Sequence, residues 1–232
     1  DIRSMGGVWK KMPMTYLLMI IGTLALTGFP FLSGFYSKDA IIEYAYLDGS
    51  TIGYFAAGIG IITAVMTAVY SWRLIFLTFH GKFNNKNIKL NAIHESPLIM
   101  IIPCSLLALG AIFVGFVFKD LFIGYESLNF WKDSIFFLKD LQYEHPPIWL
   151  IIITPFLIIF TIPISYYLFI VNKIILKNLV TKNQNFYNFL LNKWYFDELY
   201  NIIFVEPVKK IGLFLWKKGD IRVIDRFGPD GL

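Results

Sequence analysis

The sequence predicts an all-α, polytopic membrane protein. Of its 232 residues, 56% are hydrophobic and only 16% are charged, whereas soluble domains average about 25% charged residues. The mean hydropathy is +0.60. The apolar residues fall into four long stretches, and each reaches the roughly 20 residues that a helix needs to cross a bilayer. This composition excludes a soluble enzyme domain and an intrinsically disordered chain.

Cysteine and histidine usage argues against a disulfide framework and against a metal site. Cys104 is the only cysteine, and the three histidines, His80, His94 and His145, lie far apart in the sequence. Their spacing fits no common metal-ligand pattern. No nucleotide-binding loop or nucleophile motif is present. We therefore expect no metal, no catalytic residue and no cofactor in this chain.

The first apolar stretch, residues 14–46, is too long for one straight helix. Its 33 residues would extend about 50 Å, against a hydrocarbon core of about 30 Å. Pro30 removes a backbone donor, and Gly28 and Gly34 permit non-helical dihedral angles. We predict two half-helices, 14–27 and 35–46, joined by unwound backbone. Such broken helices are typical of ion and substrate pathways.

Two ionisable residues follow the predicted break directly. Lys38 lies eight residues before the end of the stretch, which is about 12 Å along a helix. Adjacent helical residues point about 100° apart, so Lys38 and Asp39 are not expected to pair. A lysine buried at that depth must find a partner, find water or lose its proton. We predict that Lys38 and Asp39 belong to a proton path.

The second stretch, residues 51–79, has the length of a single crossing. Small residues at Ala57, Gly60, Ala64 and Ala68 suit close helix packing. Arg73 lies about 10 Å from the end of this helix, where it can reach the membrane surface or form a structural ion pair. The alternative interpretation gives Arg73 a functional role and places it inside the protein, on the ion path.

The third and fourth stretches, residues 97–118 and 148–171, carry no charged residue in their cores and are expected to be scaffold. Lysines and arginines gather before residue 14, between residues 80 and 96 and after residue 171. The turn at 47–50 has none, and the 119–146 loop is mainly acidic. This alternation predicts four crossings, with both ends of the chain on the cytoplasmic or matrix side.

Beyond residue 171 the chain becomes more polar. We divide it into a transmembrane part, residues 1–171, and a cytoplasmic-side segment, residues 172–232. Within the latter, residues 197–218 form an amphipathic pattern that is too polar for a fifth crossing, and Pro207 is expected to kink or divide it. An interfacial helix lying along the membrane surface is the favoured interpretation, and a soluble tail helix is the alternative.

Several motifs, in this order, resemble those of the largest antiporter-like membrane subunits of respiratory complex I, the subunit L and chain 5 family. The resemblance covers essentially the whole chain. The motifs are Met5-Gly6-Gly7, Lys10-Lys11-Met12-Pro13, Leu26-Thr27-Gly28-Phe29-Pro30, Ser33-Gly34-Phe35-Tyr36-Ser37-Lys38-Asp39, Tyr70-Ser71-Trp72-Arg73, Phe79-His80-Gly81, Trp194-Tyr195-Phe196-Asp197-Glu198-Leu199-Tyr200 and the segment from Gly219 to Gly231.

The resemblance implies a proton-translocating subunit of NADH:quinone oxidoreductase. The family's proton-path lysine falls on Lys38, and the acid beside it falls on Asp39. NADH, FMN, iron–sulfur clusters and quinone would be bound by the whole complex, and other membrane-arm subunits would be the partners. The family also implies a lateral helix in the C-terminal segment. Because the chain opens on Asp1, we expect a piece of a longer protein that would not pump protons alone.

Two other classes of function are weighed against this one. A subunit of a sodium/proton antiporter complex would share the fold and the broken helix. A purely structural membrane scaffold is disfavoured by the position of Lys38 after a Gly/Pro break. The lipid bilayer is an expected partner and nucleic acid is not. We expect a multi-pass protein of the bacterial inner (plasma) membrane, with the mitochondrial inner membrane as the alternative.

Overall fold

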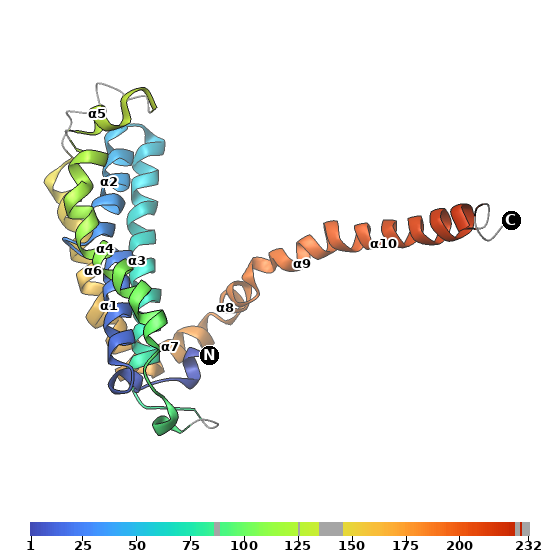
Figure 1. Ribbon diagram of the computed structural model, residues 1–232, viewed down its shortest axis with the longest axis horizontal. Coiled ribbons are helices and arrows are strands. Elements are labelled where there is room, and N and C mark those ends of the chain that lie inside the picture. The colour runs from blue at the N-terminus through green and yellow to red at the C-terminus, as the bar shows by residue number, and fades with distance from the viewer. Residues whose placement is uncertain (86–88, 125, 135–145, 226–227, 229–232) are drawn as a thin grey trace. The chain divides into compact units, whose positions relative to one another are not determined.

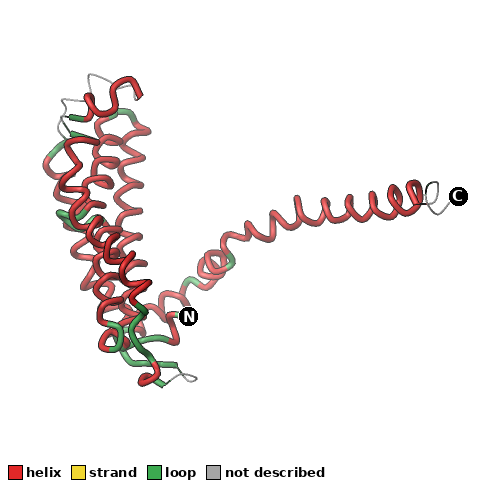
Figure 2. Tube along the Cα trace, in the orientation of Figure 1, coloured by secondary structure: helices red, strands yellow, loops and turns green. Residues whose placement is uncertain are grey.

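The computed structural model describes residues 1–85, 89–124, 126–134, 146–225 and 228. These residues form helices and loops, with no strand among them, so the predicted all-α class is confirmed. The chain divides into two units, Asp1–Lys173 and Ile174–Leu232. The division lies close to the expected boundary at residue 171. Figures 1 and 2 show the first unit as a bundle of helices and the second as a succession of helices.

The first half of the bundle contains three main helices, preceded by two short 3₁₀ turns. The turns are η1 (Ile2–Ser4) and η2 (Val8–Lys10), and the helices are α1 (Pro13–Thr27), α2 (Ser33–Leu47) and α3 (Thr51–Phe79). Proline at the first position of α1 suits a helix start, since the missing donor has no partner there. The Ser50 hydroxyl accepts a bond from the Gly53 amide at 3.0 Å and so caps α3.

The second half of the bundle is built by two long helices and the short elements beside them. They are η3 (Leu90–Ala92), α4 (Leu98–Phe122), α5 (Ser127–Trp131), η4 (Lys132–Ser134), α6 (Ile148–Tyr166) and the π-helical turn η6 (Tyr167–Val171). α4 continues one turn beyond the expected end at residue 118, and thereby carries Lys119 and Asp120 on the helix. The turn between α2 and α3 lies at the same end of the bundle as α5, while the loop after α3 lies at the opposite end (Figure 1).

The helices of the bundle differ in length, and α1 and α2 are each too short to cross a bilayer alone. Three helical segments are long and apolar enough to span a bilayer: Thr51–Phe79, Leu98–Phe122 and Ile148–Val171. α1 and α2 have 15 residues each, or about 22 Å, which is shorter than the hydrocarbon core. The prediction that α1 and α2 together make a fourth crossing stays a prediction.

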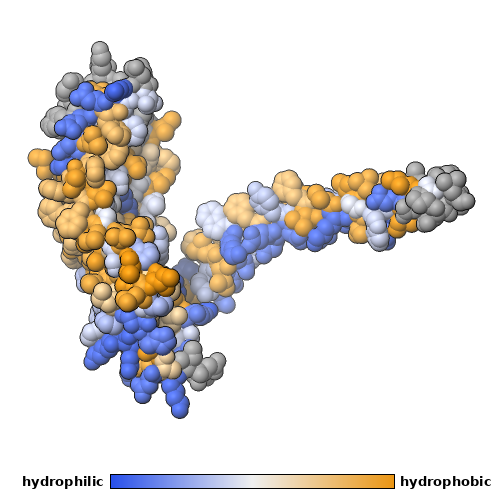
Figure 3. Space-filling model, viewed as in Figure 1, coloured by the Kyte–Doolittle hydropathy of each residue, from blue (hydrophilic) through white to orange (hydrophobic). Residues whose placement is uncertain are grey.

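Small residues bring α3 close to its neighbours. Ala57, Ala64 and Ala68 are buried, and a Cβ at Gly60 would lie 3.0 Å from the Ile42 side chain of α2. A second cluster of buried side chains lies nearer the other end of α3 and includes Trp72 and Ile75. On the visible face of the bundle, apolar residues cover the middle, and hydrophilic residues gather at the end that carries the loop after α3 (Figure 3).

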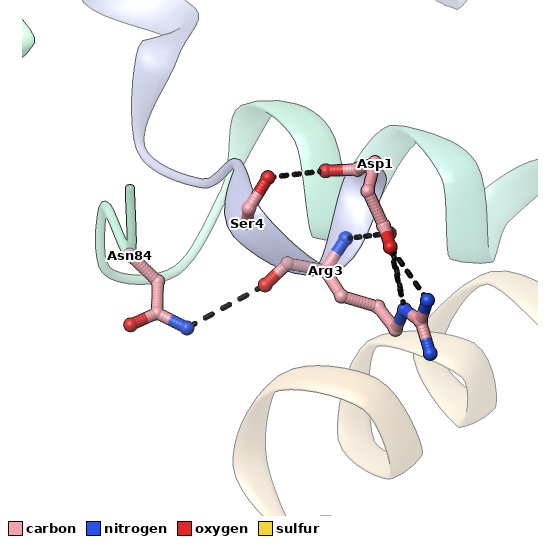
Figure 4. A network of polar contacts seen from close by, with 4 residues as sticks. All are labelled: Asp1, Arg3, Ser4 and Asn84. Carbon is pink, nitrogen blue, oxygen red and sulfur yellow. Dashed lines mark hydrogen bonds and ion pairs between the residues drawn. The ribbon is translucent and has the colours of Figure 1, made fainter. Parts of the chain in front are cut away.

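The segment before α1 is fastened to the loop that follows α3. The Gly7 amide donates to the His80 carbonyl at 3.1 Å, and Asn84 donates to the Arg3 carbonyl at 3.5 Å. Figure 4 shows this contact beside the ion pair between Arg3 and Asp1. These bonds hold the start of α1 next to the end of α3, although Pro13 and Phe79 are 66 positions apart in the chain.

The second unit consists of helices with exposed side chains. They are α7 (Lys173–Lys182), α8 (Gln184–Leu191), η7 (Lys193–Tyr195), α9 (Phe196–Tyr200), the π-helical η8 (Asn201–Val205), α10 (Glu206–Phe214) and the π-helical η9 (Leu215–Asp225). Pro207 stands in the first turn of α10, immediately after a π-helical turn. The helix therefore continues through Pro207, with a change in hydrogen bonding where the proline donor is missing.

Helix direction changes between α8 and α9, at a point that the sequence did not indicate. Lys193, Trp194 and Tyr195 all have φ between 52° and 62°, a region that side chains other than glycine rarely occupy. Trp194 packs against Phe189 with ring centroids 5.5 Å apart, and Asn192 donates to the Tyr195 hydroxyl at 2.9 Å. A different family motif runs from Gly219 to Gly231. Its residues from Arg226 to Gly231 lie outside the described residues, except Gly228.

Candidate functional site

The break between α1 and α2 begins with a local capping structure. Gly28 has φ 82°, and its amide donates to the Ala25 carbonyl at 3.2 Å. The Phe29 amide donates to the Leu24 carbonyl at 2.9 Å. These two bonds form the Schellman motif, in which a left-handed glycine ends a helix. Gly28 therefore ends α1 through its own backbone.

A tight turn then redirects the chain into α2. The Leu32 amide donates to the Phe29 carbonyl at 3.2 Å, with Pro30 and Phe31 as the central residues. Pro30 suits the first central position, but the second usually needs glycine, because its φ is positive in a type II turn. Phe31 has φ 71° and its side chain is 79% exposed. This strained backbone is retained because the helices on both sides are anchored.

The start of α2 is anchored against both α1 and α4. Gly34 packs directly on the Ala25 carbonyl, where a Cβ would collide. The Ser33 hydroxyl donates to the Gly110 carbonyl and accepts from the Gly115 amide, both at 2.9 Å. Gly115 is needed in turn, because a Cβ there would collide with Ser33. This close packing explains why residue 34 is glycine. It also gives a structural role to Ser33, for which the sequence analysis proposed none.

Lys38 reaches back from α2 across the break. Its Nζ donates to the Thr27 carbonyl at 3.4 Å, and its Cδ lies 3.4 Å from the position that a Cβ on Gly28 would take. Thr27 is the last residue of α1, where unpaired carbonyls carry partial negative charge that favours a cation. No ion pair of Lys38 with a carboxylate is found among the described residues. A neutral carbonyl orients the amine without fixing its charge.

Asp39 is buried, and among the described residues no side chain forms an ion pair with it. Its side chain is 7% exposed, and neither carboxylate oxygen has a hydrogen-bond partner within the described part of the chain. It is not ion-paired with Lys38, as the helical spacing predicts. A buried polar group without a partner costs free energy, so an unpaired carboxyl points to water or to a functional role.

Arg73 lies on a different part of the bundle. Its side chain is exposed in this chain, and its guanidinium carbon lies 5.9 Å from the centre of the Phe169 ring. Such a cation–π contact stabilises a cation next to an apolar surface. Within the described ranges, no hydrogen bond or ion pair joins Arg73 to Lys38 or Asp39. The structure therefore brings Lys38 and Asp39 to the break and leaves Arg73 apart from them.

A histidine and a tyrosine meet at the end of α3. The Tyr16 hydroxyl lies 2.7 Å from His80 Nε2, and the His80 ring packs edge-on against Phe76 and Tyr166. Burial among these rings lowers the pKa of His80 below its ordinary value. The hydrogen bond between the Tyr16 hydroxyl and His80 Nε2 thus joins the start of α1 to the end of α3. No sequence pattern indicates this contact, because 64 residues separate Tyr16 from His80.

Glu95, in the loop before α4, caps the start of α1. Its carboxylate accepts bonds from the Met14 amide at 2.7 Å and from the Thr15 hydroxyl at 2.6 Å. Desolvation acts to raise the pKa of Glu95, but the bonds from Thr15, Ser96 and Met14 outweigh it and hold the pKa below its ordinary value. No sequence pattern indicates this contact, because 80 residues separate Thr15 from Glu95.

Comparison with known proteins identifies relatives of the chain. A family model described as NADH:quinone oxidoreductase/Mrp antiporter, TM matches residues 1–67. NADH-ubiquinone oxidoreductase chain 5 of Phytophthora infestans is 41% identical over 240 residues, and that of Chondrus crispus is 41% identical over 246 residues. NADH-quinone oxidoreductase subunit L of Rickettsia bellii is 38% identical over 236 residues.

Each of these three matches covers 100% of the chain but only 36% of the relative. The chain thus spans about a third of the length of the curated relatives that it matches. The family model names both oxidoreductases and antiporters, whereas the relatives that cover the whole chain are named as oxidoreductase chains. The antiporter-complex interpretation is therefore not favoured.

Proposed function

The chain belongs to the family of antiporter-like membrane subunits of NADH:quinone oxidoreductase, and we propose that it forms part of the membrane arm of such a complex. There it couples quinone reduction, carried out elsewhere, to the movement of protons across the membrane. Because the chain covers 36% of its relatives, the activity belongs to the full-length subunit within the assembled complex.

One observation carries this proposal: the Lys38 amine reaches across the helix break to the Thr27 carbonyl at 3.4 Å. A lysine held by a carboxylate would stay charged, but a backbone carbonyl accepts from the neutral amine as well as from the ammonium ion. Lys38 is therefore oriented in both protonation states. The broken helix supplies the unpaired carbonyl, which gives the break a direct role in proton transfer.

The partners and cofactors of the complex follow from the same family membership. We place NADH, FMN, the iron–sulfur clusters and quinone in other subunits, and we propose the neighbouring membrane-arm subunits as partners of this chain. The bilayer is its solvent, because apolar side chains of α3, α4 and α6 are extensively exposed. No role for nucleic acid is proposed.

The second unit provides a second contact with the complex. We propose that its helices lie along the cytoplasmic or matrix surface and brace a neighbouring subunit. In support, residues 197–218 expose an apolar side that includes Ile202, Val208 and Leu215. Hydrophobic and hydrophilic residues gather on opposite edges of α9 and α10 (Figure 3). Such an amphipathic helix buries one side against lipid or protein.

The protein is a membrane protein, and we propose an energy-transducing inner membrane as its location. The relatives come from a bacterium, Rickettsia bellii, and from eukaryotes such as Phytophthora infestans. These names support either the bacterial plasma membrane, which the sequence interpretation preferred, or the mitochondrial inner membrane.

The substitution Lys38→Ala in the full-length subunit tests the proposed function. We expect the complex to assemble, because Lys38 makes one long hydrogen bond and no ion pair within the described chain. NADH-driven proton uptake into membrane vesicles should fall to a small fraction of the wild-type rate. The matched control is Lys89→Ala, which removes an exposed lysine from the loop before α4. Normal proton uptake in Lys38→Ala would overturn the proposal.

A further inference from the structure

A cavity of about 500 Å³ lies at the end of the bundle that carries the loop after α3. This volume falls within the range of about 300–1,000 Å³ that is common for pockets that hold small ligands. Its wall is formed by the segment before α1, the end of α3, the loop after α3 and the residues around the end of η6. Neither Lys38 nor Asp39 lines the cavity, so it is separate from the helix break.

The ionisable side chains of this cavity are mainly basic. Arg3, Lys82 and Lys173 line it, and no aspartate or glutamate does so among the described residues. Arg3 is ion-paired with Asp1 at 2.6 Å, whereas Lys82 and Lys173 form no ion pair within the described chain. A hollow that is lined by charge of one sign attracts ions of the opposite sign. The ligand that fits this cavity is therefore an anion.

Apolar side chains line the cavity beside these cations. Leu77 lies near the end of α3, and Ile170 lies in η6. Both belong to helical segments that are long and apolar enough to span a bilayer, Thr51–Phe79 and Ile148–Val171. Each stands close to the last residue of its segment, so this part of the wall lies where hydrocarbon gives way to headgroups.

The two unpaired lysines stand just outside the same segments. Lys82 follows Phe79 by three positions, and Lys173 follows Val171 by two positions. Hydrophilic residues gather at this end of the bundle on its visible face (Figure 3). Basic residues directly after a membrane-spanning helix lie at the level of the phospholipid headgroups. The cavity thus has an apolar side toward the membrane and a cationic side at the headgroups, which suits an amphiphilic anion.

Backbone contacts hold the two basic loops together. Gly6 lies directly on the Lys82 carbonyl, where a Cβ atom would collide. Asn84 donates to the Arg3 carbonyl at 3.5 Å (Figure 4). Because neither contact uses a charged group, the loops keep their place without the Lys82 ammonium, which is exposed and able to bind a ligand.

We infer that this cavity binds the phosphate group of an anionic phospholipid, whose acyl chains lie against the apolar wall. Lysine binds phosphate as a point charge, and basic pockets at the ends of membrane helices bind anionic lipid headgroups. A soluble phosphate ion has the same charge but no apolar part, so it would leave Leu77 and Ile170 without a ligand contact. The site takes no part in proton transfer, and the inference goes beyond the proposed function.

Photocrosslinking of a lipid to the assembled complex, built with the full-length subunit, tests this site. The probe is a phosphatidylglycerol with a diazirine near the headgroup end of one acyl chain, present as a small fraction of phosphatidylcholine vesicles. Mass spectrometry should find the probe on peptides that contain Leu77 or Ile170. In the double variant Lys82→Gln, Lys173→Gln the crosslinked amount should fall about tenfold or more, because each basic residue near the membrane surface strengthens the binding of anionic lipid about fivefold.

Two further double variants separate this site from general surface charge. Lys10→Gln with Lys11→Gln removes two exposed lysines from the same end of the bundle, neither of which lines the cavity, and crosslinking should stay at the wild-type amount. Lys82→Arg with Lys173→Arg keeps both charges and should retain crosslinking. An equal amount in the wild type and in Lys82→Gln, Lys173→Gln would overturn the inference, and so would an equal loss in the two glutamine variants.

Competition in the wild-type complex identifies the source of the phosphate group and needs no variant. Unlabelled phosphatidylglycerol should displace the probe, although phosphatidylcholine is already in excess. Inorganic phosphate, compared with chloride at the same ionic strength, should leave the probe in place. Displacement by inorganic phosphate would assign the cavity to a soluble phosphate and overturn the lipid assignment. Crosslinking that persists in an excess of unlabelled phosphatidylglycerol would overturn the site.

Discussion

Gly34 at the start of α2 lies directly on the Ala25 carbonyl of α1, at a distance that leaves no room for a Cβ atom. This contact holds the two half-helices close enough for the Lys38 side chain to reach the last residue of α1. The absence of a side chain at residue 34 therefore allows the close packing of α2 on α1, in addition to permitting non-helical dihedral angles.

Gly34→Ala is expected to disturb the break. The added methyl group must displace backbone, because the atom it would meet is the Ala25 carbonyl, and overpacking of this kind costs about 1–3 kcal/mol. Thermal denaturation of the purified complex should show a lower transition for this subunit, together with reduced proton uptake. Gly22→Ala is the control, since a Cβ there meets nothing within 4 Å. Wild-type stability and uptake in Gly34→Ala would contradict the close approach.

Lys38→Arg distinguishes a charge at the break from a group that exchanges protons. The guanidinium can still donate to the Thr27 carbonyl, but it stays protonated and cannot release its proton. We expect normal assembly with proton uptake as low as in Lys38→Ala. Uptake at the wild-type rate in Lys38→Arg would show that only the positive charge is needed.

Glu95→Gln should weaken the first turn of α1. The amide keeps one acceptor but loses the negative charge that favours the helix start, and a lost cap costs about 1 kcal/mol. Hydrogen exchange of the Met14 and Thr15 amides, followed by mass spectrometry, should be faster in the variant at pH 7. Glu198→Gln, an exposed acid of α9, is the control and should leave α1 unchanged.

The same carboxylate gives the cap a defined pH dependence. The pKa of Glu95 is lower in the folded protein than its ordinary value, so folding favours the ionised form. Its stabilisation is complete above the ordinary pKa of glutamate and is lost as the pH falls through the lowered value. Protection of the α1 amides, corrected for intrinsic exchange, should thus decline only in strongly acidic buffer. A decline already near neutral pH would refute the lowered pKa.

Two cysteine positions test the expected placement of the second unit. In the Cys104→Ala background, Lys209→Cys should react with an impermeant thiol reagent from the cytoplasmic or matrix side only. Ile202→Cys should be protected in the complex, although Ile202 is 67% exposed in this chain, because its side of the helix faces lipid or protein. Labelling of Lys209→Cys from the opposite side would refute the topology, and equal labelling of both positions would refute an amphipathic helix at the surface.

The sequence by itself determined those features that depend on short-range chemistry. Hydrophobic stretches and turn residues predict the all-α membrane class, and the end of α1 follows from local capping. The break illustrates this: α1 ends through bonds that the Gly28 and Phe29 amides donate to Ala25 and Leu24, three and five positions earlier, and Pro30 turns the chain within four residues. The amphipathic pattern of residues 197–218 is likewise a property of one helix.

Tertiary structure alone decided which distant groups meet. Ser33 bridges Gly110 and Gly115, Glu95 caps α1, and Tyr16 bonds His80, yet each pair is separated by more than 60 residues. Lys38 and Asp39 were identifiable as ionisable residues inside an apolar stretch, but the contact of Lys38 with the Thr27 carbonyl and the burial of Asp39 come from how helices pack. Packing depends on the shapes of facing side chains across the bundle, and helical periodicity within one segment carries no information about the facing partner.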